Sequence, residues 1–455
     1  MSGVLGQSRR FHFVGIGGIG MSGLAELLMN LGYEVSGSDM HPSEITDRLQ
    51  SLGARIFAGH DANNVAGADV AVFSSAVKPS NPEMVAARQR GIVTLPRADL
   101  LAELMELRLG IAVAGAHGKT TTTSMIAIVL EVAGFDPTAV IGGRVNVFGS
   151  SARLGQGKFL VAEADESDRS FLRLRPQIAV ITNIDREHLE AYRDFADLQN
   201  TFLEFANRVP DSGAVVICAD DDRLRAMRNS MKARTVTYGF AADTDITASD
   251  VRLDGFGSTS TVKDFGELHL NVPGRHNVLN ALAAVAVGRE LGIDRNAIAR
   301  GLESFYGAER RFQKRGEVNG ILVIEDYGHH PTEIAAVIAA ARPMTRRRML
   351  VAFQPHRFTR TQSLMHDFGP ALAGADAIVL TEIYAAGEDP INGVNIESLA
   401  GAVGASFRGE LRVVKRLEDV PREIAAMADD GDVIVLLGAG SIGSIWPAVM
   451  KELER

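Results

Sequence analysis

The hydrophobic pattern of the chain alternates short apolar runs with longer segments whose apolar positions recur at helical spacing. Runs such as Val70–Phe73, Met349–Phe353 and Val433–Leu437 are typical of strands buried on both faces. Between such runs lie helix-like segments, for example Met21–Asn30, which stops before Gly32. This alternation predicts an α/β fold with mainly parallel sheets.

The chain has 455 residues, too many for one ordinary core, and the pattern divides it into three blocks. We expect a Rossmann-like domain over residues 1–107, a central α/β domain with a phosphate loop over 108–312, and a Rossmann-like α/β domain over 313–455. Alternating polar residues between Leu253 and Leu270 predict an antiparallel excursion in the central block.

Individual elements follow from the same pattern. The other expected strands are Phe11–Val14, Glu34–Ser38, Ile92–Leu95, Ile111–Ala114, Phe159–Ala162, Ile178–Thr182, Ala214–Ile217, Ile321–Glu325 and Ala377–Leu380. The other expected helices are Ala98–Arg108, Thr122–Ala133, Asn277–Leu291 and Ser441–Leu453.

A phosphate-binding loop is predicted where a strand meets a helix. Small residues let backbone N–H groups close on phosphate oxygens, a lysine adds positive charge, and a threonine hydroxyl can bind Mg2+. Val113 stands where a glycine is usual, so the loop is a variant form, and a plain glycine-rich turn is the alternative. The loop consists of Gly115, Ala116, His117, Gly118, Lys119, Thr120 and Thr121.

A second glycine loop opens the chain. Gly15, Gly17 and Gly20 follow a strand, and Asp39 lies where an acid could meet a ribose hydroxyl. NAD or FAD, another nucleotide diphosphate, and simple packing are the alternatives. We favour another nucleotide diphosphate, because no nicotinamide chemistry is apparent elsewhere in the chain.

Acidic residues and a histidine follow the central strands. Glu163 ends a strand beside the phosphate loop and is a natural Mg2+ ligand, although the other acids of residues 163–168 could compete, or the run could be a solvated loop. His188 could bind a second cation or a phosphate, or could be an ordinary surface histidine.

Further polar candidates lie later in the chain. Asn277 and Asn280 share a helix face and suit a base or sugar, although Asn277 could simply cap the helix. The pair Arg310–Arg311 could reach phosphates or be solvated. A basic cluster at an expected strand end could hold a carboxylate or be solvated, and comprises His356, Arg357 and Arg360. A second Gly-x-Gly-x-x-Gly, residues 438–443, is interpreted mainly as strand–helix packing, with a backbone contact to substrate or phosphate as the alternative.

Composition narrows the function classes. The formal net charge is −9, which argues against non-specific nucleic-acid binding but leaves room for an anionic substrate at a local basic site. Cys218 is the one cysteine, so no intrachain disulfide forms and a reducing cytoplasm fits. No signal peptide is visible, and the apolar stretches are too short for a membrane span.

Taken together, these segments resemble the Mur ligase family over nearly the whole chain. The motifs that carry the resemblance are HFVGIGGIGMSGLAELL at 12–28, AGAHGKTTTT at 114–123, EADESD at 163–168, TNIDREH at 182–188, PGRHNVLNALAA at 273–284, RRF at 310–312, EDYGHHPTE at 325–333, FQPHRFTRT at 353–361 and YAAGEDPI at 384–391.

The resemblance implies that the three domains hold a UDP-sugar, ATP and an amino acid in turn. The implied UDP-sugar residues are Gly15, Gly17, Gly18, Gly20, Asp39, Ser74 and Ser75. The implied ATP residues are the phosphate loop with Asn277, Asn280, Arg311 and Asp326. The implied amino-acid residues are His356, Arg357 and Arg360. Lys119, Glu163 and His188 are the implied catalytic residues. Thr120 and Glu163 are the implied ligands of one Mg2+, and His188 is the implied ligand of a second.

Some family members carry a carbamylated lysine after the metal-binding histidine, but here no lysine lies between Lys158 and Lys232. This agrees with the alanine-adding branch, as does the run GIGGIGMSGLA. The resemblance then implies a ligase that joins L-alanine to the lactoyl carboxylate of UDP-N-acetylmuramate through an acyl-phosphate, in peptidoglycan precursor synthesis. His329, His330 or the phosphate itself could take the amine proton.

Three other functions compete with this one. A murein-recycling ligase adds a tripeptide to the same sugar nucleotide, an NAD-dependent dehydrogenase would use the first glycine loop, and a nucleotide-binding switch would be non-catalytic. We expect a cytoplasmic monomer or homodimer that has no nucleic-acid or membrane partner.

Overall fold

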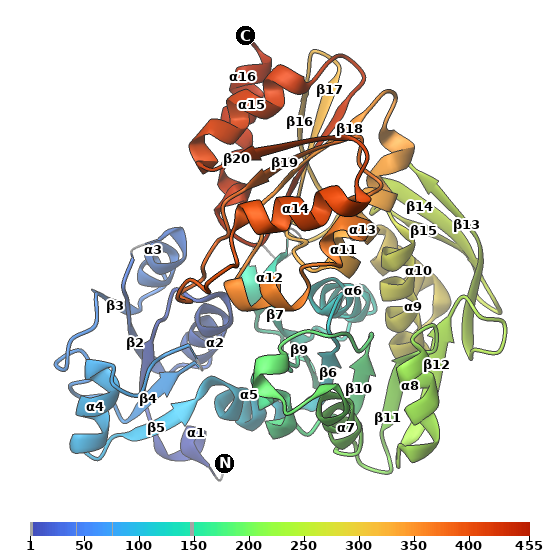
Figure 1. The fold of residues 1–455 in the computed structure, drawn as a ribbon. Coiled ribbons are helices and arrows are strands. Elements are labelled where there is room, and N and C mark those ends of the chain that lie inside the picture. Colours follow the sequence, from blue (N-terminus) through green and yellow to red (C-terminus); the bar gives the residue numbers. More distant parts are fainter. Residues whose placement is uncertain (1–2, 42, 75, 146–149) are drawn as a thin grey trace. The chain divides into compact units, whose positions relative to one another are not determined.

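The structure is a computed structural model that describes residues 3–41, 43–74, 76–145 and 150–455 (Figure 1). Its contacts divide the chain into two compact units. The first comprises residues 1–249, 262–266 and 279–305, and the second comprises 250–261, 267–278 and 306–455. Within the described residues, no helix combines the length and the apolar character that crossing a membrane requires.

The first unit opens with a five-stranded parallel sheet in the order β3-β2-β1-β4-β5. Its strands are β1 (Arg10–Val14), β2 (Glu34–Asp39), β3 (Arg55–Ala58), β4 (Val70–Phe73) and β5 (Val93–Pro96). Its helices are α1 (Val4–Gln7), α2 (Ile19–Asn30), α3 (Glu44–Ser51), α4 (Pro82–Gln89) and α5 (Arg97–Glu106). The Rossmann-like prediction for this block is confirmed. Strand β3 was not predicted, because its residues are only partly buried.

A second sheet in the first unit carries the phosphate loop, with strand order β12-β11-β10-β6-β9-β7-β8. Its strands are β6 (Leu109–Ala114), β7 (Thr138–Val145), β8 (Ser150–Arg153), β9 (Phe159–Glu163), β10 (Ile178–Ile181), β11 (Ala214–Cys218) and β12 (Arg234–Gly239). Its pairings are parallel except for β7 with β8. The helices of this part are α6 (Lys119–Val132), α7 (Phe195–Ala206), α8 (Asp222–Met227), α9 (Arg275–Glu290) and α10 (Arg295–Glu303).

The predicted excursion at 253–270 corresponds to β13 (Ile246–Asp254), β14 (Gly257–Val262) and β15 (Gly266–Leu270). Strand β13 begins beside β12, where Tyr238 pairs with Ile246.

The second unit contains a sheet in the order β16-β17-β21-β18-β19-β20, in which β16 is antiparallel to β17 and the other pairs are parallel. Its strands are β16 (Gln313–Val318), β17 (Ile321–Asp326), β18 (Met349–Phe353), β19 (Ala377–Thr381), β20 (Glu410–Val414) and β21 (Val433–Leu437). Its helices are α11 (Pro331–Ala341), α12 (Phe358–Ser363), α13 (Phe368–Leu372), α14 (Ile396–Ser406), α15 (Val420–Met427) and α16 (Trp446–Leu453). Apolar clusters on both faces bury the central strands, as their hydrophobic runs predicted.

Several predicted helix boundaries were wrong. Helix α6 begins at Lys119, before the predicted Thr122. The helix expected over Ala98–Arg108 ends at Glu106, and the strand that follows begins at Leu109. The helix expected over Ser441–Leu453 is broken into a 3-10 helix, Ser441–Ser444, and α16. Pro447 in the first turn of α16 has no N–H to donate, so it starts a new helix instead of continuing the previous turn.

The strand order places three chemically important loops together. Strands β10, β6 and β9 are neighbours and run parallel (Figure 1). Their carboxyl ends therefore meet at one edge of the sheet. The segments that follow them are residues 115–121, 163–168 and 182–188, so the topology itself assembles the site.

Candidate active site

The phosphate loop is shaped by two glycines whose positions tolerate no side chain. Gly115 has φ +134°, and a Cβ there would lie 2.0 Å from the Thr182 hydroxyl. Gly118, the residue before α6, has φ +80°, and a Cβ there would lie 2.5 Å from Asn280 Oδ1. Both values are left-handed conformations that favour glycine. The backbone is thus free to approach a ligand closely, as a phosphate loop requires.

The segment after β10 holds this loop in place. His117 N–H donates to Asn183 Oδ1 at 2.8 Å, and the Asn183 amide donates back to His117 O at 3.0 Å. The Thr182 hydroxyl donates to the same carbonyl at 2.6 Å. His117 Nε2 also lies 3.0 Å from Asp185 Oδ2. The loop is therefore preorganised by neighbouring side chains.

Lys119, the predicted phosphate lysine, folds back over its own loop. Its ammonium donates to Gly115 O at 2.6 Å, to Ala116 O at 3.1 Å and to Glu166 Oε1 at 2.8 Å. Burial lowers the pKa of Lys119, but the carboxylates of Glu166 and Asp165 outweigh burial and raise it above its usual value. The ammonium therefore stays charged at neutral pH.

Glu166 belongs to a carboxylate–histidine cluster, which consists of Glu166, Glu187 and His188. One ligand atom from each lies within 4.8 Å of the others. Burial raises the pKa of Glu166, and Lys119 offsets this only in part. Burial lowers the pKa of His188, but the neighbouring carboxylates outweigh it and raise that pKa. Two carboxylates and an imidazole form a donor set suited to a divalent cation.

Sequence reasoning selected His188 from this cluster, left Glu166 open among the acids of residues 163–168, and did not single out Glu187. Glu163, the acid that it chose instead, ends β9, and its Oε1 accepts the Gly142 N–H at 2.5 Å. Its role as a metal ligand stays a prediction, as does that of Thr120, which is nearly buried in the first turn of α6. The available signal was the position of Glu187 directly beside His188.

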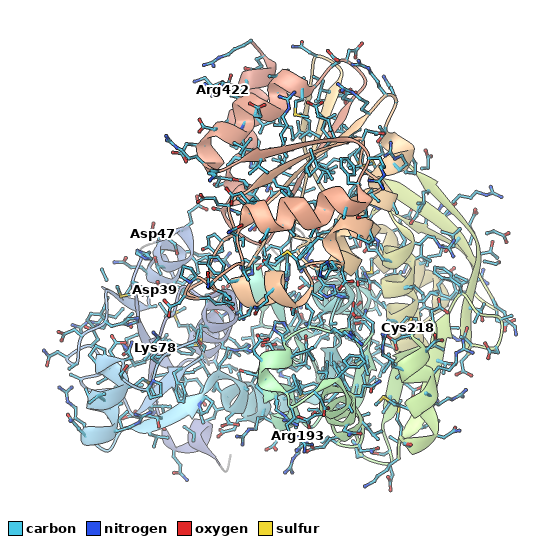
Figure 2. The ribbon with its side chains drawn as sticks, viewed as in Figure 1. Asp39, Asp47, Lys78, Arg193, Cys218 and Arg422 are labelled. Carbon is cyan, nitrogen blue, oxygen red and sulfur yellow. The ribbon has the colours of Figure 1, made fainter. Side chains whose placement is uncertain are left out.

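The first glycine loop sits at the carboxyl end of β1. Gly15 has φ +78°, and the amides of Gly15 and Ile16 both donate to Ser38 O at 2.9 Å. Asp39 Oδ2 accepts the Gly17 N–H at 2.9 Å, so this acid shapes the loop. Asp39 and Asp47, both labelled in Figure 2, line a cavity of about 150 Å3.

The remaining residues predicted to bind the UDP-sugar also lie in this part of the first unit. Gly18 precedes α2, Gly20 lies within its first turn, and Ser74 follows β4. Ser75 lies outside the described residues.

The predicted asparagines take different contacts. Asn280, in the first unit, accepts a hydrogen bond from the Thr122 hydroxyl at 3.2 Å and so lies against the start of α6. Asn277, in the second unit, donates to Pro273 O at 2.7 Å from within the first turn of α9. It therefore does not cap that helix.

Asp326 and Arg311 lie in the second unit beside the end of β17. Asp326 accepts the Phe312 N–H at 2.7 Å and the Gly328 N–H at 2.6 Å. Burial raises the pKa of Asp326 to about 6, against the opposing effects of Arg311 and these two amides. The Arg311 guanidinium lies 5.1 Å from the centre of the Tyr327 ring and 3.9 Å from Glu333 Oε1.

Arg310 has a structural role. Its Nε donates to Glu325 Oε1 at 2.6 Å, and its Nη2 donates to the carbonyls of Gly438 and Gly440 at 2.8 and 3.1 Å. A Cβ on Gly443 would lie 2.3 Å from Arg310 Nη2. Residues 438–443 therefore pack closely against Arg310, and the choice between packing and a ligand contact at their backbone stays a prediction.

The basic cluster after β18 forms an aromatic and cationic group. Arg360 Nη1 lies 3.1 Å from His356 Nδ1 and donates to His356 O at 3.1 Å. The His356 ring stacks on Tyr384 at 5.5 Å between ring centres and lies 5.6 Å from the ring of His329. Arg357, with φ +72°, donates its N–H to Tyr384 O at 2.8 Å. The structure thus brings His356, Arg360 and His329 together and adds Tyr384, which sequence reasoning missed.

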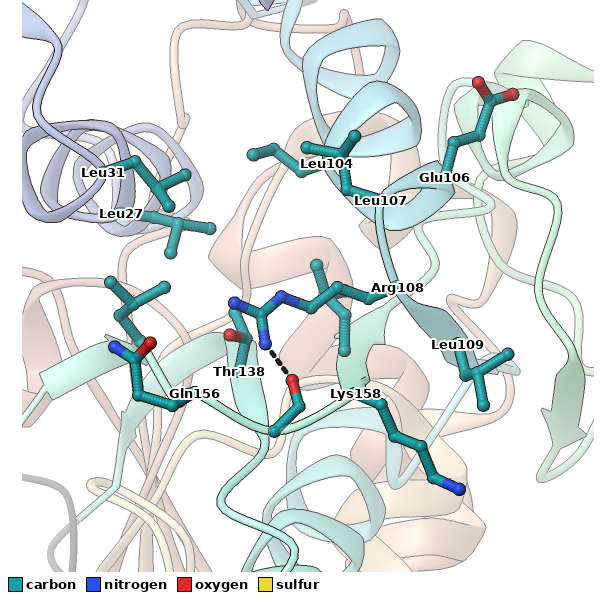
Figure 3. Close-up of a pocket in the computed structure, with 13 residues that line it drawn as sticks. Leu27, Leu31, Leu104, Glu106, Leu107, Arg108, Leu109, Thr138, Gln156 and Lys158 are labelled. Atoms are coloured by element: carbon teal, nitrogen blue, oxygen red, sulfur yellow. Dashed lines mark hydrogen bonds between the residues drawn. The ribbon is translucent and has the colours of Figure 1, made fainter. Parts of the chain in front are cut away.

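A cavity of about 740 Å3 lies beside the amino ends of the strands in the phosphate-loop sheet, whereas the phosphate loop follows a carboxyl end (Figure 3). Leu109, Thr138 and Leu160, at or near the amino ends of β6, β7 and β9, line it together with leucines of α2 and α5. The Arg108 guanidinium points into it and donates to Gly157 O. Because the phosphate loop follows the carboxyl end of β6, this cavity is separate from the candidate active site.

Family models match three successive segments of the chain. The Mur ligase family catalytic domain matches residues 10–108, the Mur ligase middle domain matches 113–288, and the Mur ligase glutamate ligase domain matches 310–440.

Relatives match over almost the full length. The UDP-N-acetylmuramate–L-alanine ligase of Geotalea daltonii is 52% identical over 455 residues, with 99% of each chain covered. That of Geobacter sulfurreducens is 50% identical over 457 residues, again with 99% of each chain covered. The crystal structure of the UDP-N-acetylmuramate–alanine ligase from Thermotoga maritima superposes with a TM-score of 0.83 at 31% identity, with 98% of each chain covered.

A murein peptide ligase from Psychrobacter arcticus superposes with a lower TM-score of 0.72 at 26% identity, covering 98% of this chain and 99% of that one. The chain belongs to the Mur ligase family, and its three-domain α/β architecture is that of the family.

Proposed function

We propose that this chain joins L-alanine to the lactoyl carboxylate of UDP-N-acetylmuramate at the expense of ATP, in peptidoglycan precursor synthesis. Two lines of support combine. Relatives at 50% and 52% identity over nearly the full length carry this activity in their names. The observation that carries the chemistry is a preorganised phosphate loop whose Lys119 lies beside a buried carboxylate–histidine cluster.

The residues divide the work as follows. The phosphate loop and Asn280 of the first unit bind ATP, and Asn277, Arg311 and Asp326 of the second unit also serve ATP. The first glycine loop with Asp39 and Ser74 binds the UDP-sugar. Arg360 and His356, with Arg357 beside them, hold the carboxylate of L-alanine, because a guanidinium suits two-pronged binding of a carboxylate.

The site also fits Mg2+. Its donors are hydroxyl, carboxylate and imidazole groups, and Glu166 Oε2 is a buried oxygen that has no hydrogen-bond partner within the described residues. Thr120 and Glu163 would hold one Mg2+ and His188 a second, and the bound ions would neutralise charge on the phosphates.

The reaction requires two anions to meet. An oxygen of the lactoyl carboxylate attacks the γ-phosphorus of ATP, the bond to the bridging oxygen breaks, and ADP leaves. The amine nitrogen of L-alanine then attacks the acyl carbon, and phosphate leaves as the amide forms. Lys119 lowers the repulsion in the first step by offsetting negative charge. His329, His330 and the phosphate remain the candidates for taking the amine proton. ATP and UDP-sugars are cytoplasmic metabolites, so we place the reaction in the cytoplasm.

A coupled assay of ADP release tests this function. UDP-N-acetylmuramate and ATP are supplied with L-alanine, with the murein tripeptide or with no acceptor, and the product is identified by mass spectrometry. We expect ADP release and amide formation with L-alanine alone. ADP release that depends on the tripeptide would instead assign the murein-recycling ligase activity to the chain.

A further inference from the structure

Glu166 is a buried carboxylate, and in the described structure only one of its two oxygens accepts a hydrogen bond. Its side chain is 2% exposed, and its Oε1 accepts a hydrogen bond from Lys119. Within the described part of the chain, its Oε2 has no hydrogen-bond partner. Buried carboxylate oxygens normally have partners, because an unsatisfied one has lost its water without replacement. The second oxygen therefore indicates a ligand site.

The surroundings of Glu166 favour a cation as that ligand. The cluster atoms of Glu166, Glu187 and His188 already lie within 4.8 Å of one another. Oxygens around a bound Mg2+ stand roughly 3 to 4 Å apart, so only small side-chain movements would close the cluster around an ion. The hydroxyl of Tyr192 donates to Glu166 O and anchors the backbone of this residue.

Lys119 is engaged by the protein itself. An ammonium group has three N–H donors. Those of Lys119 have three acceptors in the protein, the carbonyls of Gly115 and Ala116 and Glu166 Oε1. To meet a phosphate, Lys119 must release at least one of them, and Glu166 is the one that carries charge.

We propose that Lys119 and a divalent cation compete for Glu166. A cation held by Glu166, Glu187 and His188 repels the Lys119 ammonium and weakens its bond to Glu166 Oε1. The lysine is then free to turn towards a phosphate. Cation binding would thus make Lys119 available to bind a phosphate in the loop. This step deepens the proposed function and depends on it only for the identity of the phosphate.

The local charges support competition. The charged groups that act on Glu166 are Lys119, Asp165 and His188, and Glu187 acts on both Lys119 and His188. Arg97 Nη2 lies 3.6 Å from Asp165 Oδ2. Lys119 is consequently the main balance to the cluster carboxylates, and a doubly charged ion can take over that balance.

Mn2+ binding without nucleotide provides the first test. Free Mn2+ is measured by electron paramagnetic resonance at pH 8.0 under argon, for the wild type and for Lys119→Met, Glu166→Gln and Lys158→Met. Lys158→Met is the matched control, because it removes the same charge from an exposed site in the same unit. Thermal melting checks that each variant is folded.

Lys119→Met should bind Mn2+ about tenfold more tightly or better, because its competitor is gone. Glu166→Gln should bind Mn2+ about tenfold or more weakly, and Lys158→Met should match the wild type. Lys119→Met would then bind Mn2+ more tightly than the wild type although it lacks the lysine that binds phosphate. Unchanged or weaker binding by Lys119→Met overturns the proposal, as does unchanged binding by Glu166→Gln.

A second test uses the wild type alone and avoids any folding defect. Acetic anhydride labels lysines, and mass spectrometry follows the peptides that contain Lys119 and Lys158. Mn2+ should speed labelling of Lys119 and leave Lys158 unchanged, because the Lys119 amine then leaves Glu166 and becomes accessible to the reagent. Equal labelling of Lys119 with and without Mn2+ contradicts the competition. Neither test requires amide formation, so a failed ligase assay and a failed competition remain distinguishable.

Discussion

Two buried glutamates, one in each compact unit, differ in how many of their carboxylate oxygens are paired. Glu325 is fully buried at the end of β17, and both of its oxygens are paired: Arg310 donates to Oε1 and Arg315 to Oε2, each at 2.6 Å. Glu166 is almost as buried but pairs through one oxygen, to Lys119. The saturated carboxylate has no capacity left for a ligand, whereas the half-paired one has.

The partners differ in the same way. Arg310 also donates to the carbonyls of Gly438 and Gly440, so it joins three parts of the second unit into a rigid corner. Among the residues that the structure describes, Lys119 donates only to its own loop and to Glu166. A lysine on a flexible stem exchanges partners more readily than a guanidinium fixed at several points. The comparison indicates that the Lys119–Glu166 pair can exchange partners, whereas the Arg310–Glu325 pair stabilises the fold.

The largest expected effect comes from removing Lys119. Lys119→Ala should lower ATP-dependent amide formation by about 10^3-fold, because a preorganised positive charge at the transferred phosphoryl group is lost. The circular dichroism spectrum should remain that of a folded protein. Turnover is measured as ADP release with L-alanine. Near-normal turnover of this variant would show that Lys119 and the phosphate loop have no role in the reaction.

Asp326 sharpens the comparison, because two backbone amides donate to it and, in the described part of the chain, no cationic side chain forms an ion pair with it. Its folded pKa of about 6 lies above the ordinary 3.8, so the folded state favours the protonated carboxyl. This contribution to stability is complete below pH 3.8 and is lost as the pH rises through 6, by about 3 kcal/mol in total.

Asp326→Asn stays neutral, so it should lack this dependence. Urea unfolding at a series of pH values, followed by the fluorescence of Trp446, measures the second unit, since this is the one tryptophan of the chain. The difference in unfolding free energy between the wild type and the variant should fall as the pH rises from 4 to 7. A constant difference would show that burial does not hold the proton.

A smaller effect is expected from Arg360, which stands in contrast to the structural Arg310. Arg360→Ala should raise the KM for L-alanine about tenfold, the cost of one charge-assisted pair. The KM for ATP should change little. Steady-state kinetics with each substrate varied in turn measure both KM values. A change confined to the KM for ATP would show that Arg360 does not bind L-alanine.

Much of the fold could be predicted from the sequence, because parallel strands that are buried on both faces appear as continuous apolar runs. Val70–Phe73, Met349–Phe353 and Val433–Leu437 are strands with the predicted bounds. Strands β3, β7, β8, β12, β16 and β20 escaped prediction. β3 is partly exposed, and Gly142 and Gly143 interrupt the apolar run of β7.

The candidate site was predicted less completely. The glycines and Lys119 lie next to one another in the sequence, so their motif was visible. The choice among the acids of residues 163–168 depends on which carboxylate faces Lys119, and this is set by the path of the chain after β9. Tyr384 joins His356 only through a bridge between two loops, which no local pattern reveals.

The most direct test of the comparison is a paired measurement on Glu166→Gln and Glu325→Gln. Urea unfolding gives stability, and the ADP-release assay at 25 °C gives activity. Glu325→Gln should lose about 3 kcal/mol of unfolding free energy, because two partly buried arginines lose their charge partner, and should keep its rate of amide formation while folded.

Glu166→Gln should lose only about 1 kcal/mol or less and yet form the amide about 10- to 100-fold more slowly. This opposite pattern in the two variants is the predicted result. A Glu166→Gln enzyme that keeps full activity, or a Glu325→Gln protein as stable as the wild type, would contradict the distinction between an exchangeable and a structural carboxylate.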